Sequence, residues 1–467
     1  MTAPTQRRIE DAGRRARSAR SARPALASRL LRLVPYVVMS LVAAYFVSTT
    51  VRMHGFDLSV IDEWQYLGYL FGLPGHPIVF RGDLVGVEAN ELFSCYGAGP
   101  FPSVGSPCGG DYTDWNAYPQ AGLNSADGYT PLYFWITWLV GKAIQTVTGT
   151  NFVIAMRLTG LFWLLPTLWV SYAAMVRMRT PRYFALAIVL LFTVMPFSWW
   201  AYTYVSTDAA VPLMGALALL VVVRHATGRG SLWWLLPIGL VGGALKITAI
   251  FAPMFAVVAL FIHWAAGAWL RSRPRTPASP RSFGRRMAFW PTAIPAIAGM
   301  LGFVAVTFGW IVARGLMAVG PAAEQGITLP PERYLGSFLD TIPGMLGNFV
   351  GMGTDVYRVA PWVVAVMSWL FVGGVVGAAI RRHPSVAAQS LAWTTGIAAL
   401  AFLPLLFVLT VVQGVPFALP ARYCAALAPM ALMSLALLAD ARSGRIAVTG
   451  IIGILVWNQL ANAAVLA

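Results

Sequence analysis

The sequence contains few charged residues. Asp, Glu, Lys and Arg make up 11% of the 467 residues, whereas 58% are hydrophobic. Because a soluble domain carries about 25% charged residues, this composition excludes an ordinary soluble globular protein. The hydrophobic residues form repeated runs of about 20, the length that a helix needs to cross the hydrocarbon core of a bilayer. The composition therefore predicts an all-α polytopic membrane protein.

Several common catalytic patterns are also missing. The five histidines are scattered, and no zinc-ligand spacing, Ser-His-Asp arrangement or nucleotide-binding loop is visible. The formal net charge is +16, but the arginines stand in short clusters between apolar runs. Such clusters are typical of the cytoplasmic ends of membrane spans. We therefore expect a lipid bilayer, and no nucleic acid, as the partner of the basic residues.

The positive-inside rule predicts the topology. Residues 1–28 are read as a basic, disordered cytoplasmic tail, and residues 29–467 as one transmembrane domain. The amino terminus is expected inside and the carboxyl terminus outside. Five later basic clusters should be cytoplasmic: Arg177/Arg179/Arg182, Arg224/Arg229, Arg271 to Arg286, Arg381/Arg382 and Arg442/Arg445. About eleven spans are expected, near 31–50, 153–176, 183–201, 205–223, 231–246, 248–269, 289–313, 360–380, 389–412, 423–440 and 446–464.

The count depends on the apolar segment 130–147. If this segment crossed the membrane, all five basic clusters would lie outside. A helix lying along the outer surface keeps them inside, and Lys142 with several aromatic residues suits such an interfacial helix.

Residues 51–150 form a long segment that we place outside the cytoplasm. They hold nine of the seventeen acidic residues against three Lys or Arg. Cys95 and Cys108 lie here among Gly, Pro and Ser, and an oxidising compartment favours a disulfide between them. Two free thiols are the alternative. The third cysteine, Cys424, is read as a packed helix residue.

Two adjacent carboxylates, Asp62 and Glu63, follow the first span. At the membrane surface they could accept the proton of a hydroxyl group. The competing interpretation is structural, because Ser59-x-x-Asp62 also matches a helix capping box. The two interpretations are compatible, since a cap would hold a carboxylate rigidly.

Three other charged residues are candidates for the same site. Asp208 falls at the outer mouth between the third and fourth spans, Lys246 lies between two short apolar runs, and Arg157 comes early in the second span. A charge within the membrane costs on the order of 2.5–3.5 kcal/mol on insertion scales, so it usually has a partner or a task. The structural alternative for each is an ion pair that orients helices, or a side chain that reaches the interface.

The order of these features resembles the GT-C superfamily of integral membrane glycosyltransferases, which includes the protein O-mannosyltransferases and the aminoarabinose transferase of lipid A. The resemblance covers most of residues 55–430, and each piece is only two or three residues long. The matching pieces are Asp62-Glu63, Tyr129-Thr-Pro131-Leu-Tyr133, Arg157-Leu158, Asp208, Leu245-Lys246-Ile-Thr248 and Arg422-Tyr423.

The resemblance implies transmembrane helices with two surface helices in the first outer loop. It implies a polyprenyl-phosphate-linked sugar donor and an envelope glycan, glycolipid or protein acceptor. Transfer would occur on the outer face of the inner (plasma) membrane. Direct use of a nucleotide sugar is not expected, because the acidic site faces away from the cytoplasm.

The resemblance also implies roles for individual residues. Asp62 would be the general base or would orient the acceptor hydroxyl, with Glu63 in support. Asp208 would bind the acceptor or a divalent cation, which is the only cofactor considered. Arginine forks match phosphate geometry well. The candidates for binding the donor phosphate are Lys246, Arg333, Arg358 and Arg422, and the other candidate substrate-binding residues are Arg157, Tyr133 and Tyr423.

Two long segments outside the motifs remain. Residues 314–359 are predicted to be extracytoplasmic and to include an amphipathic helix that covers the site, or one that lies passively at the interface. Residues 74–128, rich in Gly, Pro, Asn and Asp, match no part of the family. We interpret this second segment as a candidate for selecting the acceptor.

Two other classes of protein stay open. A lipid-linked glycan polymerase or ligase would share the compartment and the arginines, but it tends to place its large loop late in the chain. A secondary transporter would show repeats with broken spans at corresponding places, and no such symmetry is visible. The enzyme interpretation requires Asp62, Asp208 and Lys246 to converge on one site.

Overall fold

The computed structural model describes residues 31–99, 103–272, 289–323, 328–347, 361–439 and 441–466. Within these ranges the chain is helical, with only two isolated β-bridges, both in the first loop. Nine helices in the described ranges are long and apolar enough to cross a membrane. The prediction of a polytopic all-α membrane protein is confirmed at this level. The predicted tail 1–28 lies outside the described residues.

Most predicted spans correspond to one of these helices. The nine candidates are Leu31–His54, Phe152–Arg177 (α5 Phe152–Leu158 with α6 Gly160–Arg177), Thr207–Ala226 (η4 Thr207–Ala210 with α9 Val211–Ala226), Ile247–Ala268 (η6 Ile247–Ile250 and most of α11 Phe251–Ser272), Phe289–Leu316 (α12), Pro361–Ile380 (α15), Val386–Val412 (α16), Ala421–Leu438 (η8 Ala421–Leu427 with α17 Ala428–Leu438) and Arg442–Asn462 (within α18 Arg442–Leu466).

Two predicted spans are not among these nine candidates. Residues 183–201 divide into α7 (Arg182–Thr193) and α8 (Pro196–Ala201), because the chain turns before Pro196, which lacks the N–H needed to continue a helix. Residues 231–246 form η5 (Leu232–Trp234) and α10 (Leu235–Leu245). Lys246 ends this unit in an extended conformation. Lys246 belongs to the site described below.

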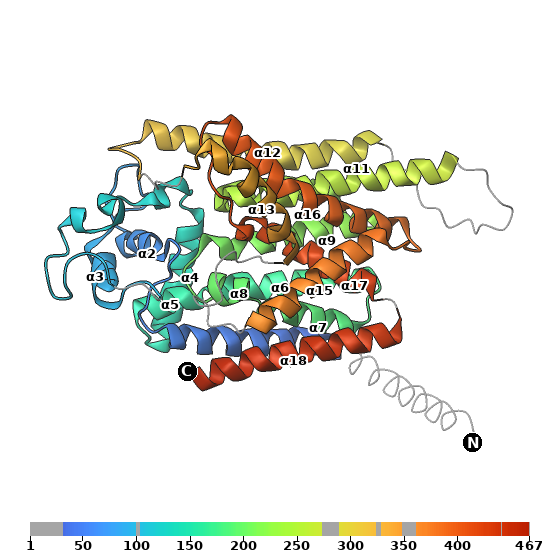
Figure 1. The fold of residues 1–467 in the computed structure, drawn as a ribbon, viewed down its shortest axis with the longest axis horizontal. Helices are drawn as coiled ribbons and strands as arrows, with labels where there is room; N and C mark the ends of the chain where they lie inside the picture. Colours follow the sequence, from blue (N-terminus) through green and yellow to red (C-terminus); the bar gives the residue numbers. More distant parts are fainter. Residues whose placement is uncertain are drawn as a thin grey trace, which may run out of the picture.

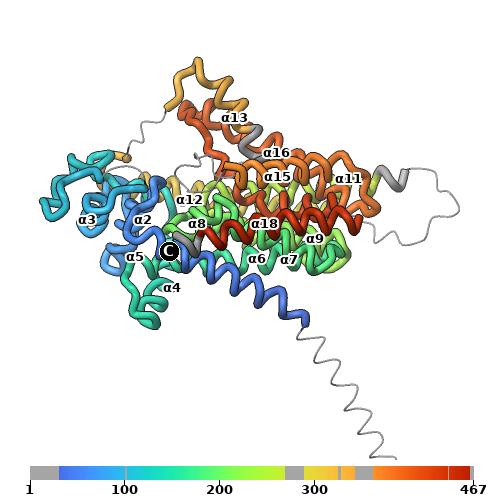
Figure 2. The backbone as a smooth tube through the Cα atoms, turned by 60° about the horizontal axis from the view of Figure 1, so that its bottom comes forward, coloured from blue at the N-terminus to red at the C-terminus, as the bar shows by residue number. Residues whose placement is uncertain are grey.

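The helices form a bundle with the first loop gathered at one end. This loop contains α2 (Glu63–Gly72), α3 (Val87–Tyr96) and α4 (Leu132–Thr148), as Figure 1 shows. The view in Figure 2 places the same elements at that end. The segment predicted as a surface helix is α4, which is not among the candidate spans. Cys95 and Cys108 of this loop are joined in a disulfide, and Cys424 is free and buried.

The basic connections between helices meet at the opposite end. Arg177 Nε donates to Thr227 Oγ1 at 2.9 Å, which joins the α6–α7 connection to the end of α9. Arg381 Nη1 donates to the Leu438 carbonyl at 2.6 Å, which joins the end of α15 to the end of α17. These two arginines therefore lie away from the acidic first loop, whereas most of the predicted cluster Arg271 to Arg286 lies outside the described residues.

Close packing fixes the interior of the bundle, and its outer helices present apolar side chains. α6 packs on α9, and α10 packs on α12. Phe308 on α12 and Trp457 on α18 are among the most exposed large hydrophobic side chains, as expected for helices that face lipid. Gly215 on α9 lies against the Ala426 carbonyl of η8 so closely that a Cβ there would clash with it.

The predicted amphipathic helix in 314–359 is present as η7 (Pro331–Arg333) and α13 (Tyr334–Gly347). α13 packs against α16, α15 and η8, and Figure 2 shows it on the outer side of α16.

Candidate functional site

Four segments distant in sequence meet at the first-loop end of the bundle. They are the start of α2, η4, the break at Lys246 and η8. None of these is the middle of a regular α-helix, so each can turn a polar side chain toward the others. In η4 the Ser206 hydroxyl caps the turn by accepting from the Asp208 amide at 3.2 Å. This hydrogen bond fixes the backbone of Asp208.

Asp62 occupies the N-cap position of α2 but does not cap it through its side chain. Its backbone is left-handed, with φ 56° and ψ −4°, and its carboxylate makes no capping hydrogen bond. The capping-box interpretation is therefore wrong for Asp62. Ser59 Oγ instead accepts from the Ile61 amide at 3.1 Å and from Trp200 Nε1 at 2.8 Å. The Asp62 side chain is partly exposed, and its Oδ2 accepts from Tyr66 Oη at 3.3 Å.

Tyr66 connects Asp62 to the interior. Its hydroxyl lies 3.2 Å from Tyr129 Oη and 3.3 Å from Thr207 Oγ1. Burial raises the pKa of Tyr66 well above its usual value, so the hydroxyl stays protonated at physiological pH. Its single proton can serve only one of three neighbouring oxygens at a time, which makes Asp62 an incompletely satisfied acceptor.

Lys246 and Asp208 continue the network on the far side of Thr207. Lys246 Nζ donates to Thr207 Oγ1 at 3.0 Å and lies 2.8 Å from Asp208 Oδ1. The Tyr129 ring covers the ammonium at 5.4 Å. Asp208 Oδ2 also lies 3.6 Å from Arg422 Nε. Asp62, Asp208 and Lys246 therefore converge, as the enzyme interpretation requires.

Arg422 is the accessible cation of this network. Its guanidinium lies over the rings of Trp200 and Tyr423, 5.6 Å from each centroid, and 15% of its side chain is exposed. Its contact with Asp208 is an ion pair without an aligned hydrogen bond. Arg422 is also close enough to Asp62 for an electrostatic interaction. In the part of the chain that the structure describes, the Arg422 guanidinium donates no hydrogen bond, and its position is set by the two rings and by the charge of Asp208.

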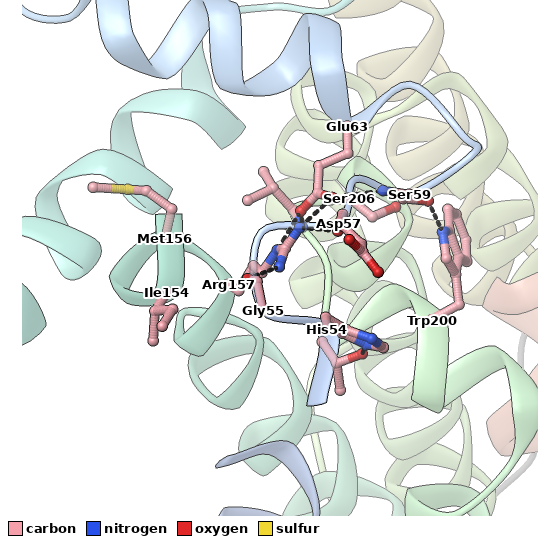
Figure 3. Close-up of polar contacts among 12 residues, drawn as sticks. His54, Gly55, Asp57, Ser59, Glu63, Ile154, Met156, Arg157, Trp200 and Ser206 are labelled. Atoms are coloured by element: carbon pink, nitrogen blue, oxygen red, sulfur yellow. Dashed lines mark hydrogen bonds and ion pairs between the residues drawn. The ribbon is translucent and has the colours of Figure 1, made fainter. Parts of the chain in front are cut away.

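Glu63 has a different environment from its neighbour Asp62. Its Oε1 accepts from Arg157 Nε and from the Val205 amide, both at 2.9 Å. Its Oε2 accepts from Arg157 Nη2 at 2.9 Å and from the Ser59 amide at 2.8 Å, as Figure 3 shows for the Arg157 and Ser59 contacts. Glu63 is fully buried. Both oxygens are occupied, so the supporting catalytic role predicted for Glu63 is not favoured.

Arg157 is the buried partner of Glu63. The sequence predicts that it binds substrate, but its guanidinium also donates to the carbonyls of Gly55 and Asp57 at 2.9 and 2.7 Å and stacks over Tyr204. It is fully buried, and Figure 3 shows it directed into the turn after the first span. These contacts give Arg157 a structural role, which is the alternative that the sequence left open.

The four remaining predicted site residues lie in different settings. Tyr133 is buried, and its hydroxyl accepts from the Ser206 amide at 3.2 Å, so it positions η4. Tyr423 lies beside Arg422 and is partly exposed. Arg333 is exposed on η7. Arg358 lies outside the described residues.

Sequence reasoning gave no role to Tyr66 or Thr207. Tyr66 stands four residues after Asp62, the spacing that brings two side chains onto one face of a helix. Thr207 directly precedes Asp208, and a hydroxyl beside a carboxylate in a tight turn can reach the same partner. The sequence does not point to Trp200, because its contacts with Ser59 and Arg422 depend on how the chain turns between α7 and η4.

The described residues contain no group of three His, Cys, Asp or Glu side chains that could hold a metal ion. Asp208, the carboxylate considered for a divalent cation, already faces Lys246 and Arg422. The residues present therefore do not fit a metal centre at this position.

Comparison of the sequence with protein-family models and with curated proteins found no match for this chain. The function of this chain is therefore inferred from the geometry of the site. A partly exposed carboxylate, Asp62, and a partly exposed arginine, Arg422, lie at the two ends of a buried polar network.

Proposed function

We propose that this protein is a membrane glycosyltransferase that moves a sugar from a polyprenyl-phosphate-linked donor to an extracytoplasmic acceptor in cell-envelope glycan or glycolipid assembly. The observation that carries the proposal is the chain of contacts from Asp62 through Tyr66, Thr207 and Lys246 to Asp208 and Arg422. This network combines an acceptor for a hydroxyl proton with two cations for a leaving phosphate, which are the two requirements of the reaction.

In the proposed step, an acceptor hydroxyl attacks the anomeric carbon of the donor sugar. Its proton passes to the carboxylate of Asp62, the new bond forms between the acceptor oxygen and the anomeric carbon, and the bond from that carbon to the phosphate oxygen breaks. The electron pair leaves with polyprenyl phosphate. Arg422, with Lys246 behind it, would stabilise the negative charge that develops on this group.

The left-handed backbone of Asp62 supports its role. Asp is one of the few residues other than Gly that adopts this conformation with some frequency, and holding it there costs on the order of 1–3 kcal/mol. The conformation directs the carboxylate toward Tyr66 instead of the free amides of α2. A helix cap would be satisfied by those amides and would be a weaker proton acceptor.

The lengths of the neighbouring helices suit a lipid-linked donor. We infer that α7 and the unit Leu232–Leu245 also cross most of the bilayer, which makes eleven crossings. With 12 and 14 residues, these helices are roughly 18 and 21 Å long, whereas the hydrocarbon core is about 30 Å thick. The site at their ends would then be recessed below the outer surface, within reach of a phosphate at the head of a membrane-embedded chain.

The test is transfer by the purified protein in nanodiscs. Radiolabelled polyprenyl-phosphate sugars, nucleotide sugars as a separate panel, and an envelope lipid extract would be supplied to the wild type and to Arg422→Met. We expect label to move from one polyprenyl-phosphate donor into a new product, with at least a tenfold loss for Arg422→Met, because a charge-assisted hydrogen bond contributes about 1.5–3 kcal/mol.

Three other outcomes would overturn the proposal. Transfer from a nucleotide sugar would place the donor site on the cytoplasmic side. Polymerisation of lipid-linked oligosaccharides without transfer of single sugars would indicate a polymerase or ligase. Binding of polyprenyl phosphate with no product from any donor would favour a transporter.

A further inference from the structure

A second cationic cluster lies where the first loop meets the carboxyl-terminal end of α12. Two arginines, Arg81 from the loop and Arg314 from the last turn of α12, lie near the buried carboxylate of Asp127. The backbone brings them together, because the amides of Val319 and Gly320, just after α12, donate to the Arg81 carbonyl at 2.8 and 3.2 Å. In the described part of the chain, no hydrogen bond or ion pair joins these arginines to the reaction site.

Arg314 has a structural partner. Its Nε donates to Asp127 Oδ2 at 2.5 Å, and Trp310, one turn earlier on α12, donates from Nε1 to the Asp127 carbonyl at 3.3 Å. These contacts hold η3 (Ser125–Gly128) against α12. The Arg314 side chain is still 32% exposed, and within the described ranges its two Nη groups donate no hydrogen bond. The outer donors of its fork are therefore available to a ligand.

Arg81 has no such partner. It lies close enough to Asp127 for an electrostatic interaction, yet no hydrogen bond or ion pair joins its guanidinium to another described residue. Its Nε and Asp127 Oδ1 are both shielded from solvent without a hydrogen-bond partner. Asp83, the nearest acid in sequence, accepts instead from His76 and from the Phe80 amide. Two guanidinium groups therefore share one carboxylate, and a half-buried cation without a partner costs free energy unless an anion completes it.

The surface around Arg314 is apolar. Phe308, Ile311 and Leu316 of α12 are exposed, and so is Val319 just after the helix. Figure 1 shows α12 along one edge of the bundle, so in a membrane this face would contact lipid. A basic group at the end of such a helix lies at the level of the lipid head groups. A dissolved anion would gain nothing from the apolar surface, whereas the chains of a lipid would cover it.

We propose that Arg81 and Arg314 bind the phosphate of an anionic membrane lipid, whose chains lie along the exposed face of α12. Guanidinium forks match the geometry of phosphate oxygens. The excess positive charge of the cluster favours a head group with a net negative charge over a zwitterionic one. This site is built from the first loop and α12, whereas Arg422, assigned above to the donor phosphate, belongs to η8. The binding does not rest on the proposed glycosyl transfer.

Native mass spectrometry of the delipidated full-length protein tests the site. Dioctanoyl phosphatidylglycerol is the anionic probe and dioctanoyl phosphatidylcholine the zwitterionic one. We expect phosphatidylglycerol to bind the wild type several-fold more tightly than phosphatidylcholine. Arg81→Met should weaken phosphatidylglycerol binding by about tenfold, because it removes a charge-assisted hydrogen bond. Arg52→Met is the matched control, since Arg52 is exposed near the first-loop end of the span Leu31–His54 and does not belong to the cluster.

A double variant tests the second arginine. Arg314→Met alone would leave a buried carboxylate without its cation, so it is combined with Asp127→Asn. The pair should also weaken phosphatidylglycerol binding by about tenfold. Thermal unfolding identifies a variant that does not fold. Arg81→Met should unfold close to the wild-type temperature, because no hydrogen bond or ion pair holds its guanidinium in the described ranges.

Four results would overturn the proposal. The first is equal binding of the two lipids by the wild type, and the second is equal binding of phosphatidylglycerol by Arg81→Met, Arg52→Met and the wild type. Displacement of phosphatidylglycerol by an equal concentration of inorganic phosphate would indicate a site for a dissolved anion. Weaker binding of polyprenyl phosphate by Arg81→Met would assign this arginine to the donor site. Because no sugar donor is present, the result is independent of whether the protein transfers sugar.

Discussion

At the residue scale, two neighbouring carboxylates, Asp62 and Glu63, lie in different surroundings. Asp62 is partly exposed and shares one tyrosine hydroxyl, whereas Glu63 is buried with both oxygens bound. The sequence shows only that they are adjacent. Their difference arises because Asp62 precedes the helix with a left-handed backbone, and Glu63 begins the helix facing Arg157. The sequence around the two carboxylates does not indicate which of them pairs with Arg157, 94 positions after Glu63.

The Glu63–Arg157 pair leads to a stability prediction. Arg157→Met should lower the thermal unfolding temperature strongly, because it leaves a buried carboxylate without its cation, a change that costs about 3–5 kcal/mol. The double variant Glu63→Gln with Arg157→Met should be less destabilised than Arg157→Met alone, since no unpaired charge remains. Thermal unfolding in one detergent would measure both, with the exposed Arg333→Met as control. An equal loss in Arg157→Met and Arg333→Met would contradict the structural role.

At the scale of elements, interruptions in helices create the site. Lys246 between α10 and η6, η4 before α9, and η8 before α17 each break a regular helix. The sequence predicted apolar runs at these places and located most of the crossings. It could not predict that 183–201 divides into α7 and α8, because apolar composition continues past Thr193 while Pro196 forces the turn. Nor could it reveal the contacts between turns, which depend on packing.

The contact of α9 with η8 is a testable example. A Cβ on Gly215 would clash with the Ala426 carbonyl, so Gly215→Ala should displace the segment that carries Arg422. Overpacking of this kind costs about 1–3 kcal/mol. We therefore expect a lower unfolding temperature and a loss of transfer of tenfold or more. Gly309→Ala on α12 has open space around it and should resemble the wild type in both measurements. Normal activity in Gly215→Ala would show that this contact does not position Arg422.

At the scale of the whole molecule, charge is divided between the two ends of the bundle. The first loop carries most of the acids, and the arginine-rich connections meet at the other end. The positions of the charges along the sequence predict this separation, because the positive-inside rule places Lys and Arg at the cytoplasmic ends of membrane spans.

Cysteine accessibility tests the orientation. Gly75→Cys in the first loop should react with a membrane-impermeant maleimide on intact cells, and Ser443→Cys at the start of α18 should react only after permeabilisation. Both positions are exposed. The native cysteines should contribute little background, since Cys424 is buried and the other two are bonded. The reverse labelling pattern would place the site on the cytoplasmic side.

Two isosteric variants, compared in the transfer assay, show whether Asp62 accepts the proton of the attacking hydroxyl. Asp62→Asn removes the proton acceptor and keeps the shape of the network. Asp57→Asn changes an exposed carboxylate five residues earlier in the same turn. We expect Asp62→Asn to bind the donor normally and to lose 10²-fold or more in transfer rate, the usual contribution of a general base, while Asp57→Asn remains within a few-fold of the wild type. Equal transfer by wild type and Asp62→Asn would contradict the account.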